Sequence, residues 1–379
     1  MSSQLVQSGH NVTVICGSYA NAKTGLEQKP FIKGVRKGNI DGLNIIEIDY
    51  KYSNKLNFFR RAFLFLKFSL FSSIIALREN YEIIFATSTP LTSAIPGIVF
   101  KIIHPKKKFV LEIRDLWPEL PREMGVISNP IVLGLLGLLE KLAYIFADTI
   151  IGLAPGICKS IQTRFPQKRV EFVPNGSDST NFINKKECKL PFKKQDSDFI
   201  FIYSGTIGIA NNIITLLEAA HELQLKKIDR IKILIVGDGK QKEELLLRAK
   251  LLNLTNVFFL DPVSKQELSY LFEQSDAGLQ LLKNVKSFYN GTSPNKFFDY
   301  IAAGLPVVIN YPGWIADLIT SNKCGVLSEP LKDSLSEKMV ECMGLDNKKM
   351  SLNAINLSEK SFNWKKLSRQ WENILLSNK

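Results

Sequence analysis

The sequence has few histidines and cysteines for its length of 379 residues. The three histidines, His10, His104 and His221, stand far apart and outside any motif, so we expect no histidine in catalysis. The five cysteines form no close pair, which argues against a disulfide framework or a zinc site and favours a reducing cytosol. The first residues lack the pattern of a signal peptide, and no nucleic-acid-binding motif occurs. We therefore expect a cytoplasmic protein without a nucleic-acid partner.

Acidic residues are fewer than basic ones, and the net charge is +13. Residues 1–182 hold 22 Lys and Arg against 14 Asp and Glu, whereas the remainder holds 27 against 22, so the two parts carry +8 and +5. The hydrophobic content of 45% and the charged content of 22% are typical of a globular protein. A basic balance favours contact with anions, such as anionic lipid or a nucleotide diphosphate.

Strand and helix patterns alternate along the whole chain. Runs such as Phe199–Tyr203 are apolar on both faces, which is typical of interior parallel strands. The pattern predicts an α/β fold of two Rossmann-like domains facing a cleft. We place the first domain at 1–182, the second at 183–360, and a helix that crosses back to the first domain at 361–379. The polar segment 185–198 reads as a linker or a surface excursion; its Asp196 and Asp198 precede a strand, and we predict no metal site there.

The most informative segment runs from Ser293 to Val308. Ser293 suits a helix cap and Pro294 the first helical position, whereas Gly304 ends the helix before a buried strand. The free N–H groups of a helix N-terminus suit an anion, to which Lys296 adds a full charge. Asp299 lies one turn deeper, where a carboxylate accepts hydrogen bonds from a ribose. This spacing predicts a nucleotide-binding helix; the alternative is an ordinary capped helix.

Two glycine-containing turns follow predicted strands of the second domain. The first, Gly205-Thr206-Ile207-Gly208, lets backbone N–H groups approach a diphosphate. The second, Gly237-Asp238-Gly239, follows the next strand, and its alternative is a plain turn between a strand and a helix. In the first domain, Arg114 and Asp115 follow the strand Lys108–Ile113, at a carboxyl end where open α/β sheets bind ligands. The alternative for Arg114 and Asp115 is a structural ion pair.

Two apolar segments of the first domain are also notable. Phe58–Phe71 contains three cations, Arg60, Arg61 and Lys67, which argue against a spanning helix. It reads as a buried helix, as an interfacial helix on an anionic membrane, or as both. Ile131–Phe146 reads as a core helix.

The segment from Ser293 resembles the donor-binding motif of retaining glycosyltransferases of the GT-B fold, family four, and Arg114-Asp115-Leu116-Trp117-Pro118 resembles a signature of transferases that build bacterial O-antigen and capsule, including N-acetyl-L-fucosamine transferases. The resemblance implies transfer with retention, without a metal or other cofactor, from a nucleotide-sugar donor to a lipid-diphosphate-linked sugar at the cytoplasmic membrane face. It assigns acid–base work to Asp115 with Arg114. The donor residues it implies are Gly205, Thr206, Gly208, Gly237, Asp238, Ser293, Pro294, Asn295, Lys296 and Asp299.

The sequence departs from that family at three places. Its first strand and glycine-rich loop are missing, since Leu5–Ile15 reads as the end of a helix and the second strand. The phosphate-clamping Arg and Lys are replaced within 209–212, and Gly291 stands where many members have a second acidic residue. Two alternatives remain: a UDP-sugar 2-epimerase of the same fold, and a non-catalytic nucleotide-sugar-binding partner.

Overall fold

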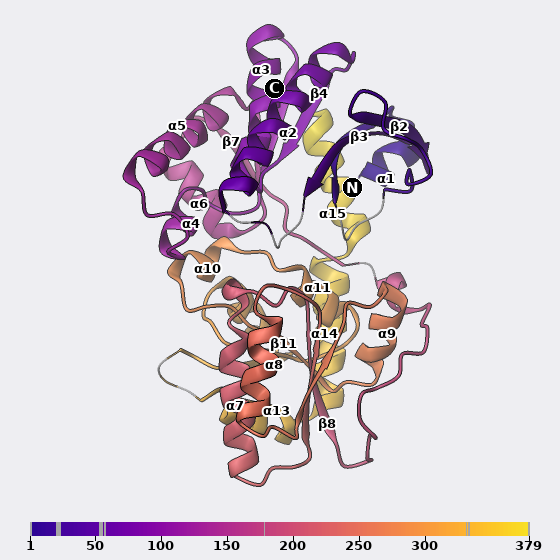
Figure 1. The fold of residues 1–379 in the computed structure, drawn as a ribbon, viewed down its shortest axis with the longest axis vertical. Coiled ribbons are helices and arrows are strands. Elements are labelled where there is room, and N and C mark those ends of the chain that lie inside the picture. The colour runs from indigo at the N-terminus through magenta and orange to yellow at the C-terminus, as the bar shows by residue number, and fades with distance from the viewer. Residues whose placement is uncertain are drawn as a thin grey trace. The chain divides into compact units, whose positions relative to one another are not determined.

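The computed structural model describes residues 2–19, 24–52, 56, 58–177, 179–330, 332 and 334–377. The chain divides into two compact units, drawn in Figure 1. Unit 1 comprises Met1–Val173 and Lys366–Lys379, and unit 2 comprises Pro174–Lys365. The observed division comes earlier in the chain than the predicted boundary at 182, and the returning segment starts later than residue 361.

Unit 2 contains one sheet of six parallel strands in the order β10-β9-β8-β11-β12-β13. Every residue of β8 is buried, because helices cover both faces of the sheet. The strand order reverses between β8 and β11, which is where open α/β sheets bind ligands. The strands are β8 Phe199–Ser204, β9 Ile231–Val236, β10 Val257–Leu260, β11 Ala277–Gln280, β12 Val307–Ile309 and β13 Gly325–Leu327.

Helices connect these strands, and several carry clear start signals. The Ser264 hydroxyl and the Glu267 side chain form the capping box of α9, and the Asp346 carboxylate caps α14. The α7 and α13 helices pack together on one side, and α11 packs against α14. The helices are α7 Ile213–Leu225, α8 Lys242–Leu251, α9 Lys265–Glu273, α10 Lys286–Gly291, α11 Asn295–Ala302, α12 Trp314–Ser321, α13 Leu335–Gly344 and α14 Asn347–Ser361.

Unit 1 holds two separate sheets among its described residues. Four parallel strands follow the order β4-β5-β6-β7, and three others follow β1-β3-β2. The β1 and β4 strands each therefore lie at the edge of a sheet. The strands are β1 Thr13–Tyr19, β2 Val35–Ile40, β3 Leu43–Tyr52, β4 Ile83–Thr87, β5 Lys108–Ile113, β6 Thr149–Gly152 and β7 Arg169–Phe172.

The β2–β3 hairpin was not predicted. Asp41 and Gly42 join the two antiparallel strands, and both residues have positive φ, 51° and 84°. This is the turn that an Asp-Gly pair favours, because it matches the twist of the flanking strands. The Asp-Gly pair before Leu43 was therefore an available signal for a hairpin.

The helices of unit 1 include three apolar ones and one from the end of the chain. The apolar helices are α2 Phe58–Arg78, α3 Ile95–Ile103 and α5 Pro130–Phe146, and the others are α1 Ser2–Gln7, α4 Glu119–Glu123, α6 Pro155–Arg164 and α15 Trp364–Leu376. The α15 helix buries Leu367, Trp371 and Ile374 against β5 and β6, which ties the end of the chain to unit 1. None of the helices in the described residues is both long and apolar enough to cross a bilayer.

The parallel α/β architecture predicted from the sequence is confirmed. Asp198, one of the two acidic residues before β8, is buried and accepts a hydrogen bond from the backbone N–H of Gln195 at 2.8 Å. That contact gives its carboxylate a structural role at the start of the sheet.

Candidate functional site

The α11 helix begins one residue later than the sequence suggests. Pro294, not Ser293, occupies the cap position, and Asn295 is the first helical residue. Ser293 is buried and bonded elsewhere: its hydroxyl accepts from the backbone N–H of Asn175 at 3.0 Å, and its carbonyl accepts from the Asn175 side-chain amide at 2.6 Å. The predicted cap was wrong because a tertiary partner takes the serine hydroxyl.

Lys296 lies in the first turn of α11 and points to the turn after β8. Its Nζ donates to Asn211 Oδ1 at 2.7 Å and to Tyr203 Oη at 3.3 Å, and it lies 4.6 Å from the centre of the Tyr203 ring. Within the described part of the chain, Lys296 has no carboxylate partner. Burial lowers the pKa of Lys296 to about 7. A partly buried lysine whose partners are all neutral can bind an anion.

Gly205 lies next to Lys296, because a Cβ added to Gly205 would come within 3.4 Å of Lys296 Cε. The backbone of Gly205 also packs against the second glycine turn, at Gly237. A Cβ on Gly237 would stand 1.9 Å from the Gly205 carbonyl oxygen, and Gly237 has a φ of +150°. Both sterics and backbone conformation therefore require glycine at 237. The two turns after β8 and β9 pack backbone against backbone.

The other residues of these turns are held by local hydrogen bonds. The Thr206 carbonyl accepts from Tyr203 Oη at 2.7 Å and from Asn211 Nδ2 at 2.9 Å. Gly208 is extended at the start of a 3-10 turn, Ile209–Asn211, and its added Cβ would meet only Thr206 at 3.7 Å. The Asp238 carboxylate accepts from the backbone N–H of the next residue at 2.8 Å.

Asp299 lies one turn after Lys296 on α11 and is three-quarters buried. Its Oδ1 accepts from the Ser177 hydroxyl at 2.7 Å and lies 3.9 Å from Lys265 Nζ. Burial raises the pKa of Asp299, and the Ser177 hydrogen bond and the Lys265 charge partly oppose that rise. The structure thus brings Lys296 to Gly205, and holds Asp299 with residues that the sequence analysis did not select.

Four residues around this site were missed. Tyr203 and Asn211 hold Lys296, and Asn175 and Ser177 hold the start of α11 and Asp299. The Pro-Asn-Gly-Ser run at 174–177 directly after a strand is a turn signal at a carboxyl end and was an available pointer. No sequence signal marks Tyr203 or Asn211, because their contacts join distant segments.

Arg114 and Asp115 belong to unit 1, whereas all ten predicted donor residues belong to unit 2. Asp115 Oδ2 accepts from the Thr89 hydroxyl at 3.0 Å. Burial raises the pKa of Asp115, opposed by the Thr89 hydrogen bond and by the charge of Arg114. The ion pair of Arg114 is formed with Glu112, at 3.6 Å between Nη1 and Oε1.

Residues at the end of β4 and just after it form hydrogen bonds with residues at the end of β5 and just after it. Thr87 Oγ1 donates to Glu112 Oε1 at 2.7 Å, and the Arg114 backbone N–H donates to Ser88 Oγ at 3.0 Å. With Thr89, three consecutive hydroxyl side chains therefore orient Glu112, Arg114 and Asp115. Sequence reasoning missed all three hydroxyls, although parallel pairing of β4 and β5 brings their carboxyl ends together.

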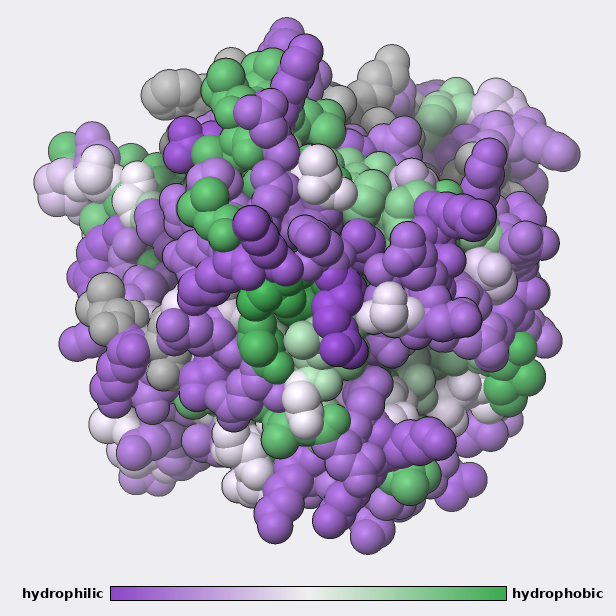
Figure 2. All heavy atoms as spheres, turned by 90° about the horizontal axis from the view of Figure 1, so that it is seen from below, coloured by the Kyte–Doolittle hydropathy of each residue, from purple (hydrophilic) through white to green (hydrophobic). Residues whose placement is uncertain are grey.

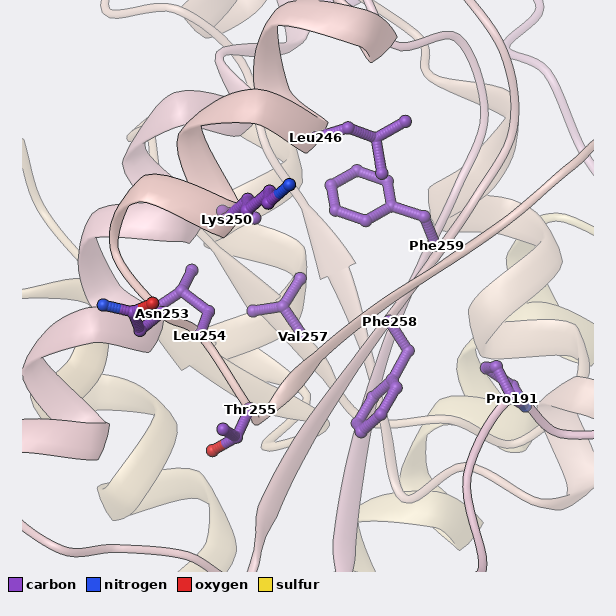
Figure 3. A pocket seen from close by; sticks show the side chains of 10 residues that line it. Pro191, Leu246, Lys250, Asn253, Leu254, Thr255, Val257, Phe258 and Phe259 are labelled. Carbon is purple, nitrogen blue, oxygen red and sulfur yellow. The ribbon is translucent and has the colours of Figure 1, made fainter.

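A cavity of about 520 Å³ lies at the outer edge of the unit 2 sheet, between α8 and β10 (Figure 3). Its lining includes Leu246, Val257 and Phe259, with Pro191 from the segment before β8. None of the predicted site residues lines it. Its lining is mainly apolar, with Lys250, Asn253 and Thr255 as the polar side chains.

Comparison with known proteins agrees with the parallel α/β units. The fold is similar to sucrose-phosphate synthase from Thermosynechococcus elongatus, with 15% identity, a TM-score of 0.70, and 98% of this chain and 90% of that chain covered. It is also similar to a structure described as trehalose-6-phosphate from E. coli bound with UDP-2-fluoro glucose, with 10% identity, a TM-score of 0.73 and coverage of 98% and 94%. A third is WaaG, a glycosyltransferase involved in lipopolysaccharide biosynthesis, with 14% identity, a TM-score of 0.59 and coverage of 87% and 98%.

These likenesses define the fold as GT-B, the fold of a large class of glycosyltransferases. Residues 184–356 match the family described as Glycosyl transferases group 1, so the family match lies within unit 2 and includes α11 and both glycine turns. No curated protein sequence matches the chain.

Proposed function

We propose that this protein is a retaining glycosyltransferase that moves a sugar from a nucleotide diphosphate donor to a lipid-linked saccharide in surface polysaccharide synthesis. The donor is a UDP-N-acetyl sugar of the L-fucosamine type, and the products are O-antigen or capsule chains. The acceptor is a lipid-diphosphate-linked sugar, which places the enzyme on the cytoplasmic face of an anionic membrane. The group 1 family match over residues 184–356 supports the transferase class.

The observation that carries the proposal is the environment of Lys296. This partly buried lysine lies beside Gly205 in the N-terminal turn of α11 and lacks a carboxylate partner in the described chain. A diphosphate supplies the missing negative charge, and the helix N–H groups supply hydrogen bonds. Without a phosphate-clamping Arg, Asn211 holds Lys296 in place by the 2.7 Å contact to its Nζ.

Two carboxylates take the other roles. Asp299 accepts hydrogen bonds from the ribose hydroxyls, while Ser177 fixes its orientation. Asp115 performs the acid–base step by accepting the proton of the acceptor hydroxyl, and burial raises the pKa of its carboxyl, which makes the carboxylate a stronger base. The leaving UDP is stabilised by Lys296 and α11, so the reaction needs no metal ion.

The first test is calorimetric titration with UDP, followed by incubation with UDP-N-acetyl sugars and a polyprenyl-diphosphate-linked sugar. Acceptor-dependent release of UDP in the presence of EDTA, with a product of retained anomeric configuration by proton NMR, supports the proposal. Conversion of the donor to its epimer without acceptor identifies an epimerase instead. Tight UDP binding without any turnover identifies a non-catalytic nucleotide-sugar-binding partner.

A further inference from the structure

Three neighbouring helices of unit 1 expose large apolar side chains outward. The α3 helix packs against both α2 and α5, so the three form one layer (Figure 1). We name their outward side the apolar face; its most exposed members are 54% to 72% accessible. They are Phe63 and Leu70 on α2, Ile102 on α3, and Ile131, Leu135 and Leu138 on α5.

The α5 helix was predicted to be a core helix, and that interpretation was half right. Its inner side buries Ala143 and Tyr144, whereas Ile131, Leu135 and Leu138 recur every three or four residues on the outer side. A helix that is apolar all round is normally covered on both sides. The outer side of α5 therefore needs a partner that the described chain does not supply.

The α2 helix repeats the pattern. Its inner side buries small polar residues, and Ser69 bonds to the backbone of the preceding turn and of the neighbouring segment. Its outer side carries Phe63 and Leu70. The buried-helix interpretation of this segment is thus confirmed for the inner side, and the interfacial interpretation stays a prediction for the outer side. By contrast, the face drawn in Figure 2 is mostly hydrophilic, with hydrophobic residues in small groups and a central recess.

The charges on the three helices are of one sign. The exposed charged side chains of these helices are the cations Arg60, Lys67, Arg78 and Lys141. The acidic residue of α5, Glu140, is buried and bonded to Arg164 at 2.8 Å. Apolar side chains with cations among them and no exposed carboxylate are complementary to an anionic lipid surface. A second copy of the same face would oppose cations to cations.

We infer that the apolar face of α2, α3 and α5 is the surface by which this protein docks on an anionic bilayer. Leucine, isoleucine and phenylalanine side chains enter the boundary between headgroups and acyl chains, and the cations bind the phosphates. The inference rests on the proposed function, because a lipid-linked acceptor requires a membrane-bound enzyme. It adds that α5 contributes as much to docking as the more basic α2.

The test compares flotation of three proteins with vesicles of phosphatidylcholine alone or with a third of phosphatidylglycerol. The first variant, Leu135→Gln with Leu138→Gln, removes exposed leucines of α5. The matched control, Leu247→Gln with Leu251→Gln, removes exposed leucines of α8 in unit 2. At low salt we expect the wild type and the control to bind anionic vesicles at least tenfold better than neutral ones. The α5 variant should lose most of that binding.

A second variant, Lys67→Gln with Lys141→Gln, separates charge from apolar contact. It should weaken binding to anionic vesicles and make the remainder insensitive to salt. Equal binding by the α5 variant and the control overturns the inference. So does gel filtration that shows a dimer which the α5 variant dissociates, since the face is then a contact between copies.

Two further measurements separate this inference from the proposed function. The α5 variant should bind UDP like the wild type, and should glycosylate a short water-soluble acceptor at the wild-type rate. If UDP is not bound by any of the proteins, the proposed function fails while vesicle binding still stands. If vesicle binding is absent while UDP binds and turnover proceeds, the docking face fails alone.

Discussion

Both units alternate strands and helices, but they differ in their sheets and in the apolar surface that they expose. Unit 2 has one six-stranded sheet whose turns at residues 205 and 237 pack backbone against backbone, so its geometry is fixed by contacts that tolerate no side chain. Unit 1 has two smaller sheets and a layer of helices whose outer side chains remain exposed and apolar. The rigid turns suit recognition of a small charged ligand, whereas an exposed apolar face suits a soft, extended partner such as a membrane surface.

The largest expected effect tests whether unit 1 takes part in chemistry as well as docking. Asp115→Asn should lower turnover about 10²-fold or more, because the variant cannot transfer a proton, as for loss of an acid–base group. UDP affinity should stay unchanged, since the donor residues belong to unit 2. Turnover assays and calorimetry measure the two quantities separately.

Thr89→Val is the companion variant. Loss of its 3.0 Å hydrogen bond to Asp115 removes a contact that favours the charged carboxylate. The pKa of Asp115 should rise further, and the acid limb of the pH–rate profile should move to higher pH. A normal rate in Asp115→Asn with a lower melting temperature would show that the carboxylate only stabilises the loop.

The second effect concerns the rigid turns of unit 2. Lys296→Met keeps the volume but removes the charge, and UDP binding should weaken by about 1.5–3 kcal/mol, the range for hydrogen bonds to charged groups. The control is Lys265→Met, which removes an exposed cation 3.9 Å from Asp299 and should change UDP affinity much less. Equal losses of UDP affinity in both variants would indicate general electrostatic attraction and no specific contact between UDP and Lys296.

A smaller effect is expected at Asp299. Asp299→Asn keeps a hydrogen-bond acceptor but loses the charge, so binding of UDP should weaken by about 1 kcal/mol. The wild type should bind 2′-deoxy-UDP more weakly than UDP by the same amount. The Asp299→Asn variant should bind UDP and 2′-deoxy-UDP equally well. Additive losses would mean that Asp299 and the ribose do not interact.

A separate effect, on stability and not on binding, is a pH dependence that unit 2 owes to Lys296. Its pKa is about 7 in the folded protein against 10.5 ordinarily, so between these values the unfolded chain binds more protons. The free energy of unfolding should therefore rise with pH from about 7 towards 10, and Lys296→Met should lack this rise. Urea unfolding at pH 7 and pH 9 measures it.

The same shift predicts proton uptake on binding. A diphosphate favours the charged lysine, so UDP binding above pH 7 should take up a proton, and affinity should fall as the pH rises. Calorimetry in buffers of different ionisation enthalpy reports the number of protons. A wild type that takes up no proton at pH 8 would show that Lys296 is already charged before the nucleotide arrives.

Local signals in the sequence determined most of the secondary structure and the position of α11. The run Phe199–Tyr203 predicted an interior strand because it is apolar on both faces, and β8 is indeed buried throughout. Gly304 and Pro306 predicted the end of α11, which stops at Ala302, with Gly304 at a φ of +76°. Such signals act within a few residues, so they can be read without the fold.

The sequence could not show which groups hold the site residues. The hydroxyl of Ser293 looked like a helix cap, yet it bonds to Asn175, more than a hundred residues earlier. Lys296 meets Asn211 and Tyr203 only because the strand order places α11 beside the turn after β8. A hydroxyl or an ammonium group forms its hydrogen bond with the partner that folding brings close to it, and that partner can lie far away in the sequence.

The same limit applies to the apolar helices. Composition indicated that α5 is a hydrophobic helix, since only Glu140 and Lys141 are charged in it, and this predicted a core helix. Only the tertiary structure decided that one side of α5 packs inward while Ile131, Leu135 and Leu138 face outward. The reason is that hydrophobicity fixes what a side chain avoids, namely water, whereas the packing of the other elements fixes how much of the helix they can cover.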